Sequence, residues 1–170
     1  MKFDHIIIRY GEISTKKRNR KAFVAKMKKH ILWSLREIPN VEVTANRERM
    51  YVILNDADHK EVIERLRGVF GIQTLSPAVK IERDAEKMKD AALYYIRQLS
   101  DTVHTFKITT KRSDKDFPYD TNEVNHMLGG HLLRNMDGLK VDVRNPDLNL
   151  LVEIRREAIY LTGEIIPGAG

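Results

Sequence analysis

Basic residues are concentrated at the beginning of this chain, where they could bind a polyanion. Eleven of the 30 Lys and Arg residues lie within the first forty positions, against three acids, so this segment has a formal charge of +8. The remaining residues carry 19 basic and 21 acidic side chains, which leaves −2. A local positive field of this kind predicts a polyanionic partner, most often a nucleic acid.

The first candidate site is the start of a helix predicted from residue 16 to residue 37. Phe23, Met27 and Ile31 recur at helical spacing, which predicts that one side packs on a sheet while the basic side faces outward. Free N–H groups at a helix N-terminus also favour phosphate. A solvated lysine-rich face is the alternative, although almost no acids are interspersed. The candidate nucleic-acid contacts are Lys16, Lys17, Arg18, Arg20 and Lys21.

The second candidate site is a predicted strand and the loop that follows it, over residues 105 to 118. Apolar residues alternate with Lys107, Thr109 and Lys111, which predicts one apolar and one basic face. Basic side chains with hydroxyls and an aromatic ring suit phosphate contacts and base stacking. A lysine-protected edge strand is the alternative. The candidate nucleic-acid contacts are Lys107, Lys111, Arg112, Lys115 and Phe117.

The third candidate site is Gly129-Gly130, inside a helix that Asp120 and Glu123 are predicted to open with a capping box. Each glycine within a helix costs about 1 kcal/mol relative to alanine. This cost suggests the close approach of another group, either a phosphate or a neighbouring part of the chain. Packing within the chain is the commoner of the two reasons.

No set of residues has the pattern of an assembled active site. The chain has no cysteine, which excludes disulfides and thiolate zinc ligands. His126 and His131 are five residues apart, a poor helical spacing for a shared metal. Glycine-rich nucleotide loops and nucleophile motifs are also missing from the sequence. The sequence therefore predicts no catalytic site and no metal site in this chain. No apolar stretch is long enough for a membrane span, and the expected location is the cytoplasm.

The expected elements form two halves of an α+β protein. In the first half we predict strands at 3–10, 41–44 and 50–54 and an extended segment at 72–81. Helices are predicted at 16–37 and at 58–67, the second opened by a capping box of Asp58 and Glu61. A polar turn is expected at 46–48. The resulting β-α-β-β-α-β order is that of a ferredoxin-like domain.

The second half has another order of elements. Helices are predicted at 84–98 and from residue 120, and strands at 105–110, 141–143, 148–154 and 158–165. We expect an N-terminal domain over 1–78, a second α/β domain over 79–166, and the start of a linker at 167–170.

Three segments resemble the tRNA 4-thiouridine synthetases, or tRNA sulfurtransferases. The first runs from Tyr10 through Lys17 to Phe23. The second includes residues 105–112, Phe117-Pro118 and Gly129-Gly130-His131, and resembles the THUMP domain of the family. The closing strands at 141–155 also fit it. The resemblance spans the whole chain, and the last residues, 167–170, resemble the linker that precedes the family's catalytic domain.

The resemblance implies a ferredoxin-like and a THUMP domain that together bind tRNA at its acceptor stem and 3′ end. It also implies an ATP- and Mg-dependent PP-loop domain that acts on the uridine at tRNA position 8. The PP-loop motif and all cysteines are missing from this sequence, so we expect it to be an N-terminal fragment of such an enzyme, with a stand-alone relative as the alternative. A cysteine desulfurase as sulfur donor, a possible homodimer and a role in thiamine biosynthesis are further implications.

Two other functions remain open on the sequence alone. THUMP domains also occur with tRNA methyltransferases, pseudouridine synthases and deaminases, although the opening around Tyr10 to Glu12 favours the sulfurtransferases. A ligand-sensing ferredoxin-like dimer is the second alternative, and the uneven charge argues against it. We expect both basic clusters to bind one RNA.

Overall fold

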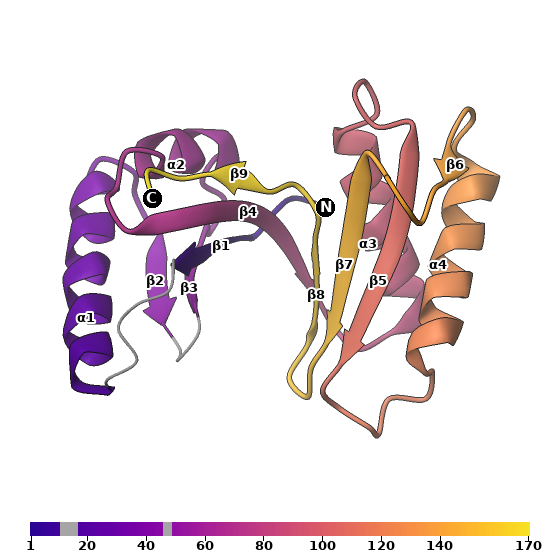
Figure 1. Ribbon diagram of the computed structural model, residues 1–170, viewed down its shortest axis with the longest axis horizontal. Helices are drawn as coiled ribbons and strands as arrows, with labels where there is room; N and C mark the ends of the chain where they lie inside the picture. Colours follow the sequence, from indigo (N-terminus) through magenta and orange to yellow (C-terminus); the bar gives the residue numbers. More distant parts are fainter. Residues whose placement is uncertain (11–16, 46–48) are drawn as a thin grey trace. The chain divides into compact units, whose positions relative to one another are not determined.

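The computed structural model describes residues 1–10, 17–45 and 49–170, with only the backbone described for 17–19. The predicted start of the first helix at residue 16 and the predicted turn at 46–48 lie outside the described residues. Two compact units make up the chain (Figure 1). The first contains Lys2–Pro77 and Ile165–Gly170, and the second contains Ala78–Glu164 with Met1.

The first unit has the predicted ferredoxin-like topology. Its strand order is β2-β3-β1-β4, and β1 is antiparallel to β3. The elements are β1 (His5–Tyr10), α1 (Lys17–Ser34), β2 (Glu42–Ala45), β3 (Arg49–Ile53), α2 (His59–Leu66) and β4 (Ile72–Ile81). All of them were predicted, with ends that differ by a few residues.

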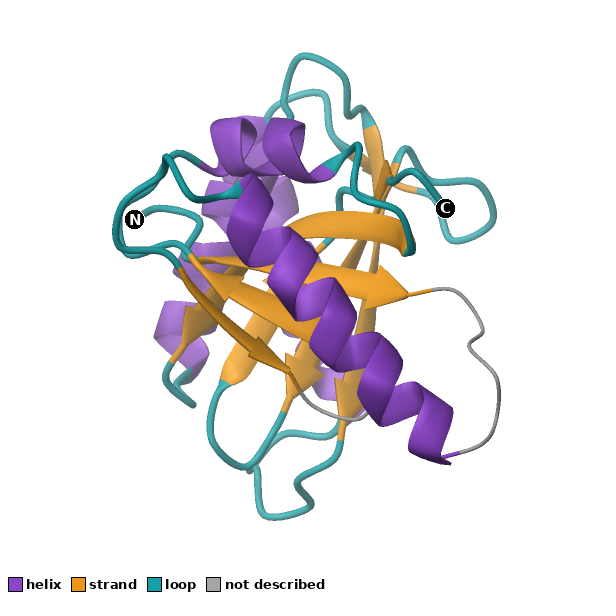
Figure 2. Ribbon diagram, turned by 90° about the vertical axis from the view of Figure 1, so that its left-hand side faces the viewer, coloured by secondary structure: helices purple, strands orange, loops and turns teal. Residues whose placement is uncertain are grey.

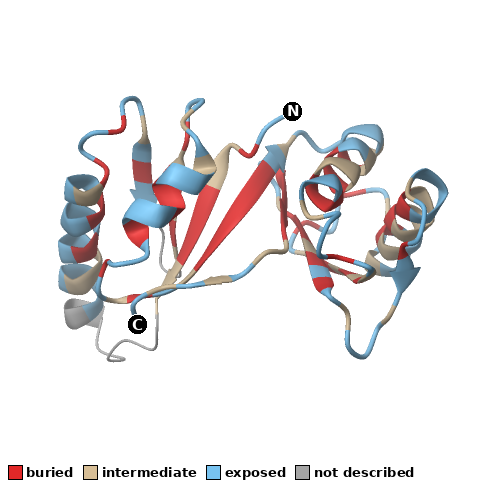
Figure 3. Cartoon of the chain, turned by 90° about the horizontal axis from the view of Figure 1, so that it is seen from above, coloured by how far each residue is buried: buried red, intermediate tan, exposed pale blue. Residues whose placement is uncertain are grey.

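Helix α1 lies across the strands of this unit (Figure 2). Met27 and Ile31 of its apolar stripe are buried, as are Ile6 and Ile8 of β1 and Met50 of β3. The stripe therefore packs as its spacing predicted, because residues three and four apart share one side of a helix. The exposed residues of α1 follow the opposite side (Figure 3).

The second unit is a mixed sheet with two helices. The end of β4 pairs with β8, and the strand order continues as β7-β5-β6. Strand β5 is parallel to β7 and β6, whereas β7 and β8 are antiparallel. The elements are α3 (Ala85–Gln98), β5 (Thr105–Arg112), α4 (Thr121–Asn135), β6 (Lys140–Val141), β7 (Leu148–Ile154) and β8 (Ile159–Thr162).

Both predicted helix caps are observed, but only one is a complete capping box. At α4, the carboxylate of Asp120 accepts from the Glu123 backbone N–H, and Glu123 accepts from the Asp120 backbone N–H. At α2, the carboxylate of Asp58 accepts from the Lys60 backbone N–H. The reciprocal bond from Glu61 is not among the contacts of the described residues, so Asp58 acts as a simple N-cap.

The last residues return to the first unit, which the sequence did not predict. A short strand, β9 (Ile166–Pro167), pairs with Thr74 and Leu75 of β4. The backbone N–H groups of Gly168 and Gly170 then donate to the carbonyls of Gln73 and Ile72. The sequence analysis placed Ile165 and Ile166 in the second domain because they follow it in the chain. The backbone of Ile166 instead pairs with β4, and both residues belong to the first unit. That residues 167–170 also begin a linker stays a prediction.

Among the residues that the structure describes, no helix has both the length and the apolar content needed to cross a membrane.

Candidate nucleic-acid interface

Strand β5 presents a basic face on the side of the sheet away from α4. Phe106, Ile108 and Thr110 are buried, while the intervening residues are half-buried or exposed. The hydroxyl of Thr110 donates to Oδ1 of Asn125, 2.6 Å away, which places α4 over the Thr110 side. Because successive strand residues point to opposite faces, Lys107 and Lys111 project on the other side.

Polar and cationic neighbours extend this basic face across three strands. Lys107 lies opposite Asn149 of β7 in the register, and the hydroxyl of Thr109 donates to the Asn149 side chain at 2.7 Å. Lys140 of β6 lies opposite Thr105 and is exposed. We call Lys107, Lys111 and Lys140, with Thr109 and Asn149, the basic sheet face. Its three ammonium groups and its hydroxyl and amide groups suit phosphate oxygens.

The acid opposite Lys111 is already paired. Glu153 of β7 lies opposite Lys111 and is 8% exposed. Its carboxylate accepts from the guanidinium of Arg155 at 3.1 Å. The negative charge of Glu153 is therefore balanced by a neighbouring guanidinium, and the basic sheet face keeps a net positive charge.

The loop between β5 and α4 is held by arginines rather than left open for RNA. The guanidinium of Arg112 donates to the carbonyls of Phe117 and Tyr119, at 3.1 and 2.9 Å. Arg83 forms an ion pair with the buried Asp114 and lies over the Phe117 ring, 5.7 Å from its centroid. These contacts fix the loop on the end of the sheet.

Phe117 and Arg112, which were expected to contact RNA, instead stabilise the fold of the second unit. Phe117 is only 4% exposed, so its ring packs in the unit instead of offering a face to a base. Arg112 uses its guanidinium to close the loop. Sequence pattern could not show this, because an aromatic ring and an arginine in a polar loop look the same whether they face inward or outward. Lys115, at the loop tip, is exposed as expected.

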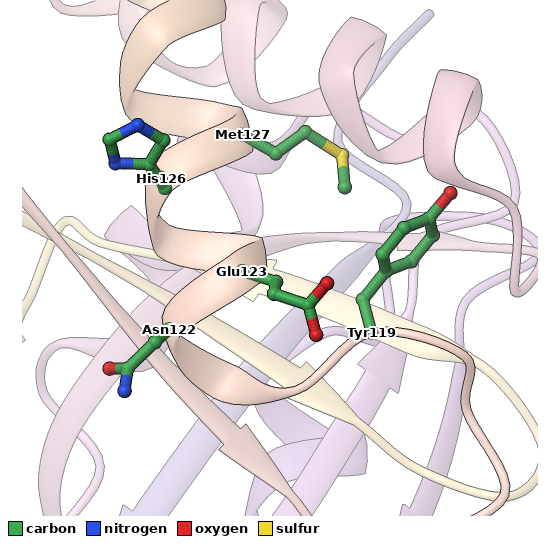
Figure 4. A pocket seen from close by; sticks show the side chains of 5 residues that line it. All are labelled: Tyr119, Asn122, Glu123, His126 and Met127. Carbon is green, nitrogen blue, oxygen red and sulfur yellow. The ribbon is translucent and has the colours of Figure 1, made fainter.

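Gly129 and Gly130 of α4 are half-buried, and no other element of the chain packs closely against them. A Cβ atom on Gly129 would have no atom within 4 Å, and one on Gly130 would meet the Arg134 guanidinium at 3.0 Å. Packing within the chain, the commoner reason for such glycines, therefore does not explain them. An open hollow of ≈ 500 Å³ beside the first turns of α4 is lined by Tyr119, Asn122, Glu123, His126 and Met127 (Figure 4).

The two glycines and the two β5 lysines are not brought together. Leu128 is buried and belongs to the stripe that packs toward the sheet. At about 100° per residue, Gly129 and Gly130 lie about 100° and 200° around the helix from Leu128. The lysines project from the opposite face of the sheet. The expectation that the Gly129-Gly130 segment lies close to Lys107 and Lys111 is wrong, because the sheet separates them.

The N-terminal cluster is only partly visible. Lys16 lies outside the described residues, and only the backbone of Lys17 and Arg18 is described, at the start of α1. Arg20 and Lys21 are exposed. The outward side of α1 continues with exposed Lys26, Lys28 and Lys29, and no acid occurs in this helix. The predicted basic side of the helix is therefore present where it is described.

Replacing Gly129 by alanine should separate helix stability from RNA affinity. The added methyl group meets no atom, so we expect the free energy of unfolding to rise by about 1 kcal/mol from helix propensity alone. If RNA approaches the helix backbone there, tRNA affinity falls in the same variant. Thermal unfolding and filter binding measure the two effects. Leu133→Ala, at an exposed position of the same helix, is the control. Unchanged affinity in the more stable Gly129→Ala protein would remove these glycines from the interface.

Two exposed aromatic residues of the first unit were missed by the sequence analysis. Trp33 is 67% exposed and Phe70 is 80% exposed. A helical wheel could have found the first, because Trp33 lies about 200° around α1 from the buried Ile31. Nothing in the local pattern distinguishes Phe70 from the buried Val69 beside it.

Comparison with known proteins identifies both units. Residues 5–76 match the ThiI ferredoxin-like domain and residues 82–164 match the THUMP domain. The fold and its basic faces thus define a protein with a ferredoxin-like domain followed by a THUMP domain. The chain belongs to the tRNA sulfurtransferase family, as its curated relatives and structural neighbours also indicate.

The relatives are considerably longer than this chain. It is 48% identical over 170 residues to a probable tRNA sulfurtransferase of Anoxybacillus flavithermus, covering all of this chain and 43% of that protein. For the corresponding Listeria monocytogenes protein the identity is 44% over 169 residues, which is 99% of this chain and 42% of the relative. The chain therefore spans less than half the length of these relatives.

Solved structures agree with this assignment. A crystal structure of a 4-thiouridine synthetase–RNA complex with bound ATP superposes with a TM-score of 0.84 at 27% identity, over 99% of this chain and 43% of that one. A protein from Pyrococcus horikoshii superposes with a TM-score of 0.81 at 30% identity, over 98% and 56%. TrmN from Thermus thermophilus, at 15% identity and a TM-score of 0.61, shares the fold.

Proposed function

We propose that this chain is the tRNA-binding region of a tRNA sulfurtransferase. It would hold the acceptor stem and 3′ end of tRNA for the enzyme's 4-thiouridine chemistry at position 8. The observation that carries the proposal is the basic sheet face, in a chain whose two domains both match this family. The complex of a 4-thiouridine synthetase with RNA, a structural neighbour, supports the same partner.

The surface favours recognition of backbone charge and shape over base identity. Lysine ammonium groups contact phosphates without reading sequence, and A-form RNA presents phosphates and 2′-hydroxyls on its accessible side. In this proposal the sheet face and the exposed cations of α1 bind the same RNA. Affinity should therefore fall steeply with salt, because each neutralised phosphate releases counterions.

The chemistry of such an enzyme would be performed outside these two domains. In the proposal, ATP and Mg act in a PP-loop domain, and a cysteine desulfurase supplies the sulfur. The bound ATP of the structural neighbour supports the first part. A homodimer, a location in the cytoplasm and a contribution to thiamine biosynthesis belong to the same proposal. Other THUMP-containing enzymes are less well supported, because the first unit matches the ThiI ferredoxin-like domain.

A binding titration with the purified chain tests the proposal. We expect tRNA to bind at low salt and to weaken by orders of magnitude between 50 and 200 mM salt if about six or more phosphates are contacted. Removing the single-stranded 3′ end should reduce affinity, whereas a DNA duplex of equal length should bind less well than tRNA. No binding of tRNA at 50 mM salt would contradict the proposal.

A further inference from the structure

Trp33 and Phe70 border a single hollow on the first unit. Trp33 lies near the end of α1, and Phe70 lies in the turn between α2 and β4. Both line a hollow of ≈ 390 Å³, together with His30, Arg65 and Val69. Large aromatic side chains exposed together, rather than singly, mark a binding surface.

Neighbouring contacts hold the two aromatic residues in place. Gly71 has a φ of 97°, and a Cβ atom there would lie 2.6 Å from the Met27 side chain. The turn that carries Phe70 is therefore pressed against α1, in a conformation that favours glycine. The guanidinium of Arg36 lies 4.0 Å from the centroid of the Trp33 ring and donates to the Trp33 carbonyl at 2.9 Å. This contact restrains the indole and places a cation on the ring.

The charge around the hollow favours an anionic partner. Glu37 is paired at 3.0 Å with Arg65, which lines the hollow, and Glu64 is paired with Arg67 at 3.7 Å. The cations on the same side of α1 as Trp33 have no acids interspersed among them, because the helix contains none. These exposed cations are Lys26 and Lys29, seven and four residues before Trp33, with His30 between them and the indole.

We propose that Trp33 and Phe70 form a stacking site for unpaired bases of single-stranded RNA, whose phosphates lie along Lys29 and Lys26. Aromatic rings beside a basic track are the combination that binds single strands, because every unpaired base offers a face for stacking. A base-paired stem hides these faces, so the site selects a single-stranded segment. This inference rests on the proposed function and names a second, chemically different contact within it.

The single tryptophan of the chain makes the site directly observable. We expect a ten-nucleotide oligoadenylate RNA to quench the Trp33 fluorescence saturably, and a blunt-ended RNA duplex of the same length to leave it unchanged. By anisotropy of the labelled single strand, Phe70→Ala and Trp33→Leu should each weaken binding about tenfold. Val143→Ala, at a 65% exposed position in the second unit, is the control and should bind as the parent does.

Two results would overturn the inference. The first is that the oligonucleotide binds without changing the Trp33 fluorescence and binds the Phe70→Ala variant with unchanged affinity. The other is Trp33 fluorescence that changes with protein concentration alone, together with a dimer in sedimentation, because a second copy would then occupy the hollow. If tRNA binding depends on Lys107 and Lys111 but not on Phe70, only this inference fails. If no RNA binds at all, the proposed function fails as well.

Discussion

The double substitution Lys107→Ala and Lys111→Ala should weaken tRNA binding on the order of tenfold or more at low salt. Both ammonium groups belong to the basic sheet face, and neither is needed for the core, since their side chains point away from α4. Each lost phosphate contact should reduce the slope of log affinity against log salt by about 0.9 for a helical RNA, taking duplex DNA as a guide. Filter binding at several salt concentrations measures both quantities.

Two lysines of α3 provide a matched control for charge. Lys87 and Lys89 lie in the same unit, and their ammonium groups are paired with Glu82 and Glu86. Replacing both by alanine removes the same formal charge without touching the basic sheet face. We expect a much smaller change in affinity than for the β5 pair. Equal losses in the two double variants would mean that only net charge matters, and that the basic sheet face is not the binding site.

Arg112→Ala should mainly reduce stability, although Arg112 is the direct neighbour of Lys111. Its guanidinium donates to two backbone carbonyls of the loop before α4. Hydrogen bonds from a charged donor contribute about 1.5–3 kcal/mol each, and both carbonyls would lose their partner. Because the loop is only part-buried and water can reach the freed carbonyls, we expect the free energy of unfolding to fall by less than the sum, roughly 2–4 kcal/mol. Urea or thermal unfolding of the purified variant measures this.

Substitutions of the neighbours Lys111 and Arg112 should therefore have different effects, the first on RNA affinity and the second on stability. Lys111→Ala should lower RNA affinity and the salt slope while the unfolding midpoint stays close to that of the parent. Arg112→Lys keeps the charge but loses the planar guanidinium, whose Nη1 donates both hydrogen bonds, so it should recover only part of the lost stability. If Arg112→Ala unfolds like the parent and instead loses RNA affinity, the arginine contacts RNA directly and the loop is closed in another way.

Strand periodicity in the sequence predicted which residues of β5 share one face of the sheet. Alternation in residues 106–111 correctly assigned Lys107 and Lys111 to one face of a strand, because side-chain direction in a strand depends only on position. It could not say which elements cover the other face. That face is set by α4, through the contact between Thr110 and Asn125. The placement of Gly129-Gly130 beside the lysines failed for this reason.

Local sequence by itself determined the order and approximate ends of the helices and strands, the caps at Asp58 and Asp120, and the separation of charge. These depend on hydrogen bonds and side-chain spacing within a few residues. The tertiary structure alone decided that Phe117 faces inward, that Trp33 and Phe70 meet at one hollow, and that the last residues pair with β4. Such contacts join residues far apart in the chain, so burial and backbone pairing fix them, and no local pattern encodes them.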